Sequence, residues 1–582
     1  MLILYFVFSS ALPVCCVSAA AEISLPSGEK AEDTEKIISS FFEKHKQTNA
    51  GLAVSVFTAD EEIYTGYFGL ADFAEKSAVD ENTVFEWGDI SAMTVWVSVM
   101  QLAEQGKLSL DEDIRTYLPK GFLKKLQYDK PVTMMNLMDH NAGFEDALFG
   151  VQTKDPDRII SLGESLEKYQ PLQVYEPGTV VSYSSWGAAL AGYIVELVSG
   201  KPFYEYAAEN IFRPLGMDKT AIKPDLGDNE YVKRKRRELQ CFTAEAQLIP
   251  DSRSFINLYP AGMCTSTAGD LMRFARELLK GEKCSLFEKE TTAAKFFYPT
   301  LMLGKTELSR CCHGMWCFPE FNVNVTGHTG NTDGCSASMY LDADSGTGMV
   351  VMTNQSGETV YDQELPEKIF GKNKNIPVAE ITGYVADPCT FYSGPLRIMR
   401  AFTVSSVTPE VLEGLPCAEY SDGGVRKLAM TYGDLLILSE EDAMMLLLPF
   451  LFWIMSAVCC VACIIFKSVR SLYRLAVRSP AKTKFGWWST TSCLLCILLM
   501  ALSLPLFSGM MPSEDTSAMR IWSVCCFVLL IAIIAVLIAG VVLTVIKRPK
   551  LQVIILNIAY MLPLIIAAGN IIFWQLCMFW LL

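Results

Sequence analysis

The stretch that decides the fold of this chain is Phe85-Glu86-Trp87-Gly88-Asp89-Ile90-Ser91-Ala92-Met93-Thr94. At the start of a helix, an aspartate such as Asp89 accepts backbone N–H groups and suits the positive end of the helix dipole, which stabilises the helix by about 0.5–2 kcal/mol. Ala92 has the highest helix propensity and no charge to desolvate. Both residues therefore suit a helix start that is stabilised rather than chemically reactive.

Short motifs on both sides of this stretch occur in a definite order. Before it lie Gly51-Leu-Ala-Val-Ser-Val-Phe57 and residues 62–71, which are typical of an opening hairpin. After it come residues 100–111, Tyr117-Leu-Pro119, His140-Asn-Ala-Gly-Phe144, Pro177-Gly-Thr179, Tyr183-Ser-Ser185, Ser199-Gly-Lys-Pro202, Pro214-Leu-Gly-Met217, Pro260-Ala-Gly262, residues 266–271 and His328-Thr-Gly330. Each motif alone is a weak signal, but their number and order argue against chance.

Together these motifs resemble the serine β-lactamase and penicillin-binding protein superfamily, most closely its class C-like branch of DD-peptidases and esterases. The resemblance runs from about Gly51 to about Asn354. It implies an α/β fold with a mixed, largely antiparallel sheet flanked by helices, and an α-rich lobe. It also implies a cleft in which a Ser-x-x-Lys motif opens a long buried helix.

Both reacting positions of that cleft are replaced in this chain. Asp89 stands where the resemblance places the nucleophilic serine, and Ala92 stands where it places the lysine. An acyl-serine enzyme needs a hydroxyl nucleophile and a base that takes its proton. The chain is therefore expected to keep the fold of a hydrolase without the chemistry.

The outer wall of the cleft is retained. The resemblance assigns Tyr183 to proton transfer, Ser185 to the position of an asparagine, and His328, Thr329 and Gly330 to the strand beside the nucleophile. The backbone N–H groups of Asp89 and Asn331 take the oxyanion-hole positions. We therefore expect the ligand-binding residues to be Asp89, Tyr183, His328, Thr329 and Asn331. Pairing of His328 with Asp89, which would raise the pKa of His328 and create a pH-sensitive latch, is a further hypothesis.

Residual catalysis is the alternative to an inactive cleft. Attack by the Asp89 carboxylate on an acyl carbon would produce an anhydride, with Tyr183 and His328 as the available proton donors. Ser91 lies two residues further on, which is about 200° around a helix of about 3.6 residues per turn, so it would face away.

Charge is distributed unevenly along the 582 residues, whose net charge is -15. From Ala443 onward ten Lys and Arg face only Glu514 and Asp515, a balance of +8, so the preceding part carries -23. The strong negative charge of the part before Ala443 argues against nucleic acid as a partner. Residues 233–237, Lys-Arg-Lys-Arg-Arg, are the exception, and we expect a solvated loop there rather than a polyanion contact.

Both ends of the chain carry apolar segments. Residues 1–21 read as a signal peptide, because an apolar run precedes the small residues of Ser18-Ala-Ala-Ala21. Four apolar stretches, near residues 444–466, 486–506, 521–546 and 551–573, are long enough to span a hydrocarbon core, which takes about 20 helical residues. We therefore predict an all-α region of four transmembrane helices over residues 443–582.

The loops between these stretches predict the orientation. Six basic residues follow the first stretch, three more join the third to the fourth, and the loop between the second and third is acidic. By the positive-inside rule the two basic loops are cytoplasmic, which predicts a multi-pass cell-membrane protein with its large N-terminal domain and its C-terminus outside. The stretches contain no Asp, Glu, Lys, Arg or His. This favours an anchor or a docking surface for a membrane protein partner over a transporter.

The remaining boundaries place the hydrolase-like domain at residues 30–370 and a small β-rich spacer at residues 378–442. Nine cysteines lie between the signal and the first span, and an odd number leaves at least one unpaired. Cys311, Cys312, His313 and Cys317 lack the spacing of a structural zinc site, so we expect no metal and no cofactor.

These expectations describe a cell-envelope pseudo-hydrolase that binds a peptide, a peptidoglycan fragment or a partner protein in its cleft. One alternative is an active serine-hydrolase-family enzyme (DD-peptidase, esterase or β-lactamase-like) with an unusual site. Another is a structural subunit that acts through its membrane bundle.

Overall fold

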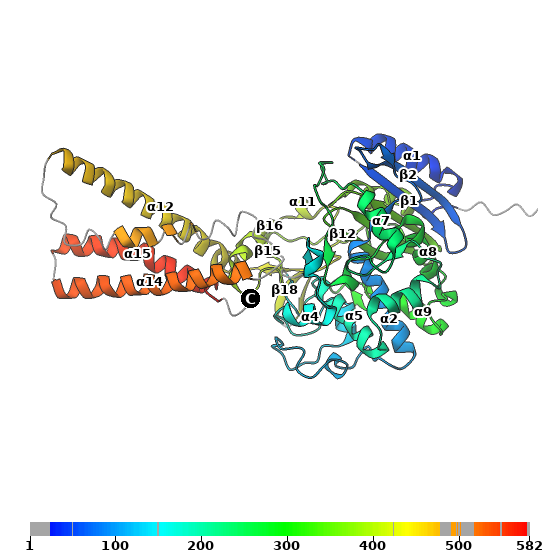
Figure 1. The fold of residues 1–582 in the computed structure, drawn as a ribbon, viewed down its shortest axis with the longest axis horizontal. Coiled ribbons are helices and arrows are strands. Elements are labelled where there is room, and N and C mark those ends of the chain that lie inside the picture. Colours follow the sequence, from blue (N-terminus) through cyan, green and yellow to red (C-terminus); the bar gives the residue numbers. More distant parts are fainter. Residues whose placement is uncertain are drawn as a thin grey trace, which may run out of the picture.

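The computed structural model describes residues 24–578 apart from 49, 148–150, 423, 478–489, 496, 499–500, 502–516 and 548–549. The predicted signal peptide and most of the second predicted span lie outside the described residues. The rest forms a large N-terminal body, a smaller sheet, and long helices that extend away from both (Figure 1).

A nine-stranded antiparallel sheet forms the centre of the N-terminal body, with strand order β3-β2-β1-β14-β13-β12-β11-β10-β9. Two adjacent strands in its middle come from opposite ends of the domain sequence, since Leu52 of β1 pairs with Thr353 of β14. The strands are β1 Gly51–Thr58, β2 Glu62–Asp72, β3 Ser77–Ala78, β9 Leu301–Met302, β10 Ser309–Cys312, β11 Met315–Phe318, β12 Val325–Asn331, β13 Ser336–Asp342 and β14 Thr347–Thr353.

Helices cover both faces of this sheet, so β1, β13 and β14 are buried almost throughout. Alternate side chains divide between the two faces: Leu52 and Val54 pack with α1 (Thr34–His45) and α10 (Glu367–Phe370). Ala53 and Phe57 pack with α8 (Ala268–Leu279) and α2 (Ala92–Glu104). The predicted mixed, largely antiparallel α/β fold is confirmed.

A helical lobe lies beside the sheet and encloses α2, of which every residue from Ala92 to Leu102 is buried. The lobe contains α3 Met134–Met138, α4 Leu162–Lys168, α5 Ser185–Ser199, α6 Phe203–Ala207 and α9 Glu290–Phe296. Two small sheets complete the body: β4 Val84–Glu86, β8 Thr265–Thr267 and β6 Thr220–Ala221 form one, and β5 Gln152–Thr153 with β7 Phe255–Ile256 forms the other.

The basic run at residues 233–237 is helical, not a solvated loop. It lies in α7 (Glu230–Glu238), and Arg236 turns inward, where its Nε donates to Glu86 Oε1 at 2.7 Å with only 3% of the Arg236 side chain exposed. The prediction was wrong for this residue because one face of a short helix can bury a guanidinium whose partner lies 150 residues earlier.

A separate five-stranded sheet, here called the spacer sheet, occupies residues 383–438 with strand order β16-β15-β19-β18-β17. Its strands are β15 Gly383–Ala386, β16 Ser405–Val407, β17 Ala418–Asp422, β18 Val425–Ala429 and β19 Asp434–Leu438. Between β15 and β16 lies a 3-10 segment, Pro395–Thr403.

The spacer sheet is fastened to the N-terminal body by a buried ion pair. Arg310 Nη1 of β10 contacts Asp434 Oδ1 of β19 at 2.7 Å, and neither side chain is more than 2% exposed. Asp434 also accepts from the backbone N–H of Val181 at 2.9 Å and from the Tyr420 hydroxyl at 2.6 Å. This network joins the sheet to the segment directly before Tyr183.

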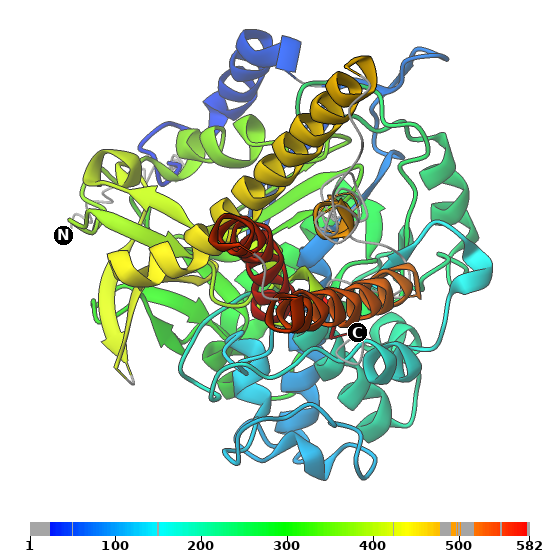
Figure 2. The ribbon, with the colours of Figure 1, turned by 90° about the vertical axis from the view of Figure 1, so that its left-hand side faces the viewer.

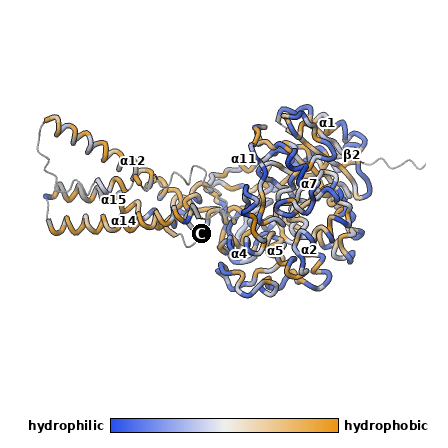
Figure 3. Tube along the Cα trace, in the orientation of Figure 1, coloured by the Kyte–Doolittle hydropathy of each residue, from blue (hydrophilic) through white to orange (hydrophobic). Residues whose placement is uncertain are grey.

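Three long helices extend from the spacer sheet: α12 Glu440–Ala476, α14 Ser517–Lys547 and α15 Leu551–Phe573. Figure 3 shows α12 and α14 as largely hydrophobic, and in Figure 2 the three helices run obliquely across the view, in front of the N-terminal body. In the described part of the chain, residues Met519–Ile546 alone are long and apolar enough to cross a membrane, and Met561–Phe573 is a shorter apolar helix. The predicted four-helix region is therefore not confirmed as a whole.

We predict that Asp434→Ala destabilises the protein by about 3–5 kcal/mol, because it leaves the Arg310 guanidinium buried without its counter-charge. Thermal unfolding of the purified full-length chain measures the change. Glu419→Ala is the matched control, since Glu419 belongs to the same sheet and pairs at 2.7 Å with Arg426, whose side chain is exposed. Equal losses for the two variants would show that the buried pair does not hold the spacer sheet.

Candidate functional site

The centre of the site is the turn between β4 and α2. Trp87 anchors it, because its ring is fully buried and its Nε1 donates to Ser266 Oγ at 2.8 Å. Gly88 follows with φ of 54°, a conformation that favours glycine. A short 3-10 turn, Gly88–Ser91, then leads into the buried helix α2. Asp89 thus lies where the chain enters the core.

Strand β12 packs directly against this turn through a second glycine. A Cβ on Gly330 would lie 2.0 Å from Trp87 O and 2.7 Å from Asp89 N. A Cβ on Gly88 would lie 2.6 Å from Asn331 N. These distances are too short for any side chain, so both glycines are required for the approach. The backbones of Asp89 and Asn331, the two predicted oxyanion-hole positions, are thereby brought together.

The Asp89 carboxylate does not cap the helix, contrary to our expectation. No side-chain cap is formed at the start of the 3-10 turn, whose N-cap residue is Trp87. Instead Ser185 Oγ donates to Asp89 Oδ1 at 3.4 Å. Burial raises the pKa of Asp89 to about 6, although the hydroxyls of Tyr183 and Ser185 act to lower it. The carboxylate is therefore directed into the cleft, at a cost in desolvation.

Ala92 is the first residue of α2 and is fully buried, so the lysine position carries no amine. Ser91 is equally unavailable: its Oγ donates to Gly88 O at 2.6 Å and accepts from Cys264 N at 2.9 Å, both within the core. Neither residue offers a nucleophile or a base to the cleft.

A cavity of about 370 Å³ opens beside Asp89. Of the predicted site residues, Asp89, Ser185 and Asn331 line it, together with Gly88. Tyr183, His328, Thr329 and Gly330 do not belong to its lining. Two further carboxylates, Glu86 and Asp333, were not anticipated as site residues, although Glu86 lies within the stretch that defines the helix start.

Tyr183, His140 and His328 form a buried cluster with Trp316. The ring centroid of Tyr183 lies 4.4 Å from that of His140 and 5.8 Å from that of His328, and Trp316 stacks on His140 at 5.4 Å. His140 Nε2 and His328 Nε2 are buried without a hydrogen-bond partner among the described residues, whereas the Tyr183 hydroxyl interacts with the Asp89 carboxylate. The cluster is therefore mainly a packed aromatic core at the edge of the cleft.

The proposed latch between His328 and Asp89 is not formed. The Nδ1–H of His328 donates to Thr329 O at 2.6 Å. Burial lowers the pKa of His328 to about 4 and that of His140 to about 3. The hypothesis was wrong because desolvation of the imidazole outweighs any attraction to the carboxylate, so His328 stays neutral at physiological pH.

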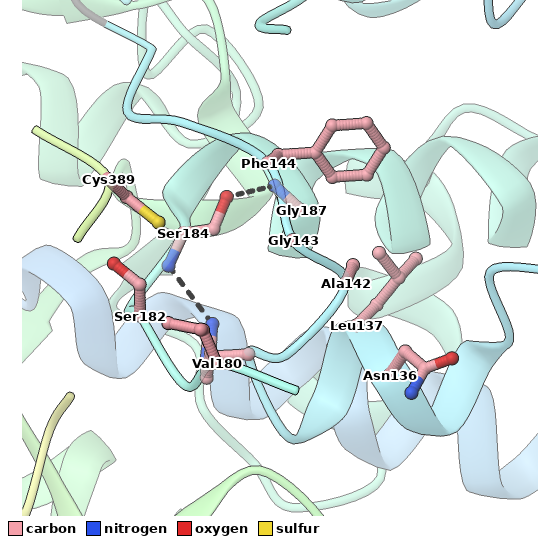
Figure 4. A pocket seen from close by; sticks show the side chains of 11 residues that line it. Asn136, Leu137, Ala142, Gly143, Phe144, Val180, Ser182, Ser184, Gly187 and Cys389 are labelled. Carbon is pink, nitrogen blue, oxygen red and sulfur yellow. Dashed lines mark hydrogen bonds between the residues drawn. The ribbon is translucent and has the colours of Figure 1, made fainter. Parts of the chain in front are cut away.

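The spacer sheet reaches the edge of the cleft, a contact that sequence motifs gave no signal for. Tyr432, in the turn before β19, lies with its hydroxyl 3.1 Å from Thr329 Oγ1. Cys389, also from this region, lines a cavity of about 10 Å³ with His140 and Ser184 (Figure 4). That volume holds about one water molecule. Ser184 N donates to His140 Nδ1 there at 3.1 Å.

No group of three or more His, Cys, Asp or Glu side chains that could hold a metal ion occurs among the residues described. In the Cys311-Cys312-His313 region, Cys312 and Cys317 lie with their sulfurs 3.5 Å apart.

Comparison with known proteins gives matches over the same part of the chain. The family model described as Beta-lactamase matches residues 37–373, more than half of the sequence. Penicillin-binding protein 4 from Amycolatopsis lactamdurans is 23% identical over 367 residues, covering 60% of this chain and 91% of that protein. A Beta-lactamase from Yersinia enterocolitica is 31% identical over 191 residues, covering 32% and 46%. The residues matched by the family model end before the spacer sheet.

One solved structure with the same fold is that of EstCE1, a hydrolase with promiscuous acyltransferase activity. It superposes with a TM-score of 0.50 at 18% identity, covering 59% of this chain and 99% of its own. At this identity the likeness is one of fold alone.

We predict that Asp89→Asn stabilises the protein above about pH 6 and changes its stability little below about pH 4. The folded state raises the pKa of Asp89 from 3.8 to about 6, so the charged carboxylate is penalised in the fold once pH exceeds that value. One pKa unit corresponds to about 1.4 kcal/mol, so we expect a gain of about 1–3 kcal/mol at pH 8.

Thermal unfolding of the full-length chain between pH 4 and pH 8 measures this gain. Asp60→Asn is the control, because Asp60 is an exposed carboxylate. A gain for Asp89→Asn that is independent of pH would contradict the assigned cause.

Proposed function

The chain belongs to the beta-lactamase family, and we propose that it is a catalytically inactive, membrane-anchored member that holds a peptide, a peptidoglycan fragment or a partner protein in its cleft. The observation that carries this proposal is the state of the reacting centre. Asp89 and Ala92 occupy the entrance to α2, and the cavity of about 370 Å³ beside them is retained.

The side chains around the cavity support binding rather than acyl transfer. Its lining includes no Lys, Arg or His, so the amine base that acyl-serine chemistry of this family requires is absent from it. Tyr183 cannot act as the base, because burial and the charge of Asp89 raise its pKa well above the ordinary value. A cavity of this volume is within the range of small-ligand sites, about 300–1,000 Å³.

The membrane part of the proposal is a multi-pass anchor with the N-terminal body and the C-terminus outside the cell. It is supported by the positions of the helix ends. α12 begins next to the spacer sheet, and Gln575, just after α15, accepts from Gly394 N at 2.8 Å. Ser523, near the start of α14, donates to Leu576 O at 2.7 Å. The end of α15 and the start of α14 therefore lie on the side of the spacer sheet (Figure 1).

This topology predicts which loops are accessible from outside intact cells. Single cysteines at positions 474 and 548 should be protected from a membrane-impermeant maleimide, because basic loops remain in the cytoplasm. Cysteines at positions 514 and 582 should be labelled, in a background where the native exposed thiols are replaced. Protection of position 514 would contradict the four-span arrangement.

The experiment that tests the inactive cleft is covalent labelling. We expect no label on the purified full-length chain from a fluorescent penicillin or a fluorophosphonate, because Asp89 and Ala92 supply neither a hydroxyl nucleophile nor an amine base at the entrance to α2. In-gel fluorescence and intact-mass measurement report the outcome. A stable adduct on any residue of the cleft would show that the protein is an active serine-hydrolase-family enzyme instead.

A repaired variant provides the positive control. Asp89→Ser combined with Ala92→Lys should restore slow acylation by an activated ester, since oxyanion stabilisation alone supplies about 10²–10³ in rate. Each single substitution should restore little, because hydroxyl and amine act as a unit. Thermal unfolding must first establish that the buried lysine is tolerated. A folded double variant without any acylation would show that the cleft has lost more than these two groups.

A further inference from the structure

The charges on the cleft identify a class of ligand. This step rests on the proposed function, in which the cavity beside Asp89 binds rather than transforms its ligand. Three carboxylates line that cavity, from Glu86, Asp89 and Asp333, and none of its lining residues is basic. A site of this kind repels the carboxylate that β-lactams and peptide C-termini carry.

Two of the three carboxylates are neutralised by the protein itself. Glu86 is paired with the buried Arg236 at 2.7 Å and accepts from Thr332 Oγ1 at 2.5 Å. Asp333 contacts Lys154 Nζ at 3.4 Å and accepts from Ser254 Oγ at 2.7 Å. Their charges are therefore already balanced before any ligand arrives.

Asp89 is different. No Lys, Arg or His nitrogen lies within ion-pair distance of its carboxylate in the described structure, and its polar neighbours there are the hydroxyls of Ser185, at 3.4 Å, and of Tyr183. A carboxylate in this position loses hydration without gaining a counter-charge, so a cation entering the cavity would gain strongly from contact with it.

The ligand must also fit the apolar side chains that line the cavity around Asp89. Val151, Ile256, Leu258 and Met263 contribute apolar side chains to the same cavity. A hydrated inorganic cation gains nothing from such a wall, whereas an ammonium group carried on an apolar chain satisfies both the carboxylate and the wall.

We infer that the cleft recognises an alkylammonium group, a primary amine on an apolar chain, with the ammonium at Asp89 and the chain against Val151, Ile256, Leu258 and Met263. A lysine-like side chain or an amino terminus next to an apolar residue has this chemistry.

The test uses three dansyl probes that differ only at the end of the alkyl chain. Dansylcadaverine ends in an ammonium, its N-acetyl derivative in a neutral amide, and dansyl-6-aminohexanoic acid in a carboxylate. Fluorescence anisotropy with the purified full-length chain should show dansylcadaverine binding roughly tenfold or more tightly than either of the others, as a charge-assisted hydrogen bond in a buried site implies.

The variants assign the preference to Asp89. Asp89→Asn should abolish the tenfold preference for the ammonium probe, whereas Asp60→Asn, which removes an exposed carboxylate elsewhere, should leave it unchanged. Asp89→Asn is expected to fold, since it removes a desolvated charge.

Equal binding of the three probes, or a preference that survives in Asp89→Asn, would overturn the inference and leave the inactive cleft in place. Failure of all three probes to bind at 1 mM would also overturn it. Failure of the proposed function would instead appear as covalent labelling by the fluorophosphonate, so the two results are distinguishable.

Discussion

The contact between Gly88 and Gly330 is the constraint on which the cleft depends. It lets the turn before α2 approach strand β12 until Trp87 O and Asp89 N lie 2.0 Å and 2.7 Å from where a Cβ of Gly330 would be. Any larger residue at either position would separate the buried helix from the central sheet. Because Asp89 and Asn331 directly follow the two glycines, the geometry of the site is a consequence of this backbone contact and not of the side chains at positions 89 and 92.

Two opposing effects act on the Asp89 carboxylate: the helix dipole favours its charged form, and burial disfavours it. The positive end of a helix dipole favours an anion by about 0.3–1 kcal/mol, and up to about 2 kcal/mol where it is partly buried. Removal of a carboxylate from water costs several kcal/mol unless a cation or several donors replace the lost hydration. Here the hydroxyls of Ser185 and Tyr183 replace the lost hydration only in part, so burial dominates and the pKa of Asp89 is raised to about 6. A residue that destabilises the fold in this way is easier to understand as part of a binding site than as a structural cap.

The spacer sheet connects the cleft to the helices that follow. Its buried Asp434 is held by Arg310 and by the backbone of Val181, two residues before Tyr183, and Tyr432 contacts Thr329 on the strand of the cleft. On its other side α12 continues directly from β19 after Ser439. The helices are therefore joined through this sheet to the segment before Tyr183 and to strand β12.

The sequence alone was enough to predict the fold class, because motifs in a common order are local features. It also located Asp89 and Ala92, whose meaning depends only on their position after Gly88. Tertiary structure alone decided the direction of the Asp89 side chain, the neutral state of His328, the burial of Arg236 against Glu86, and the contact of Tyr432 with Thr329. These features depend on desolvation or on contacts between residues more than 90 positions apart in the chain. Motif spacing and amino-acid composition do not predict which residues surround a side chain in the folded core.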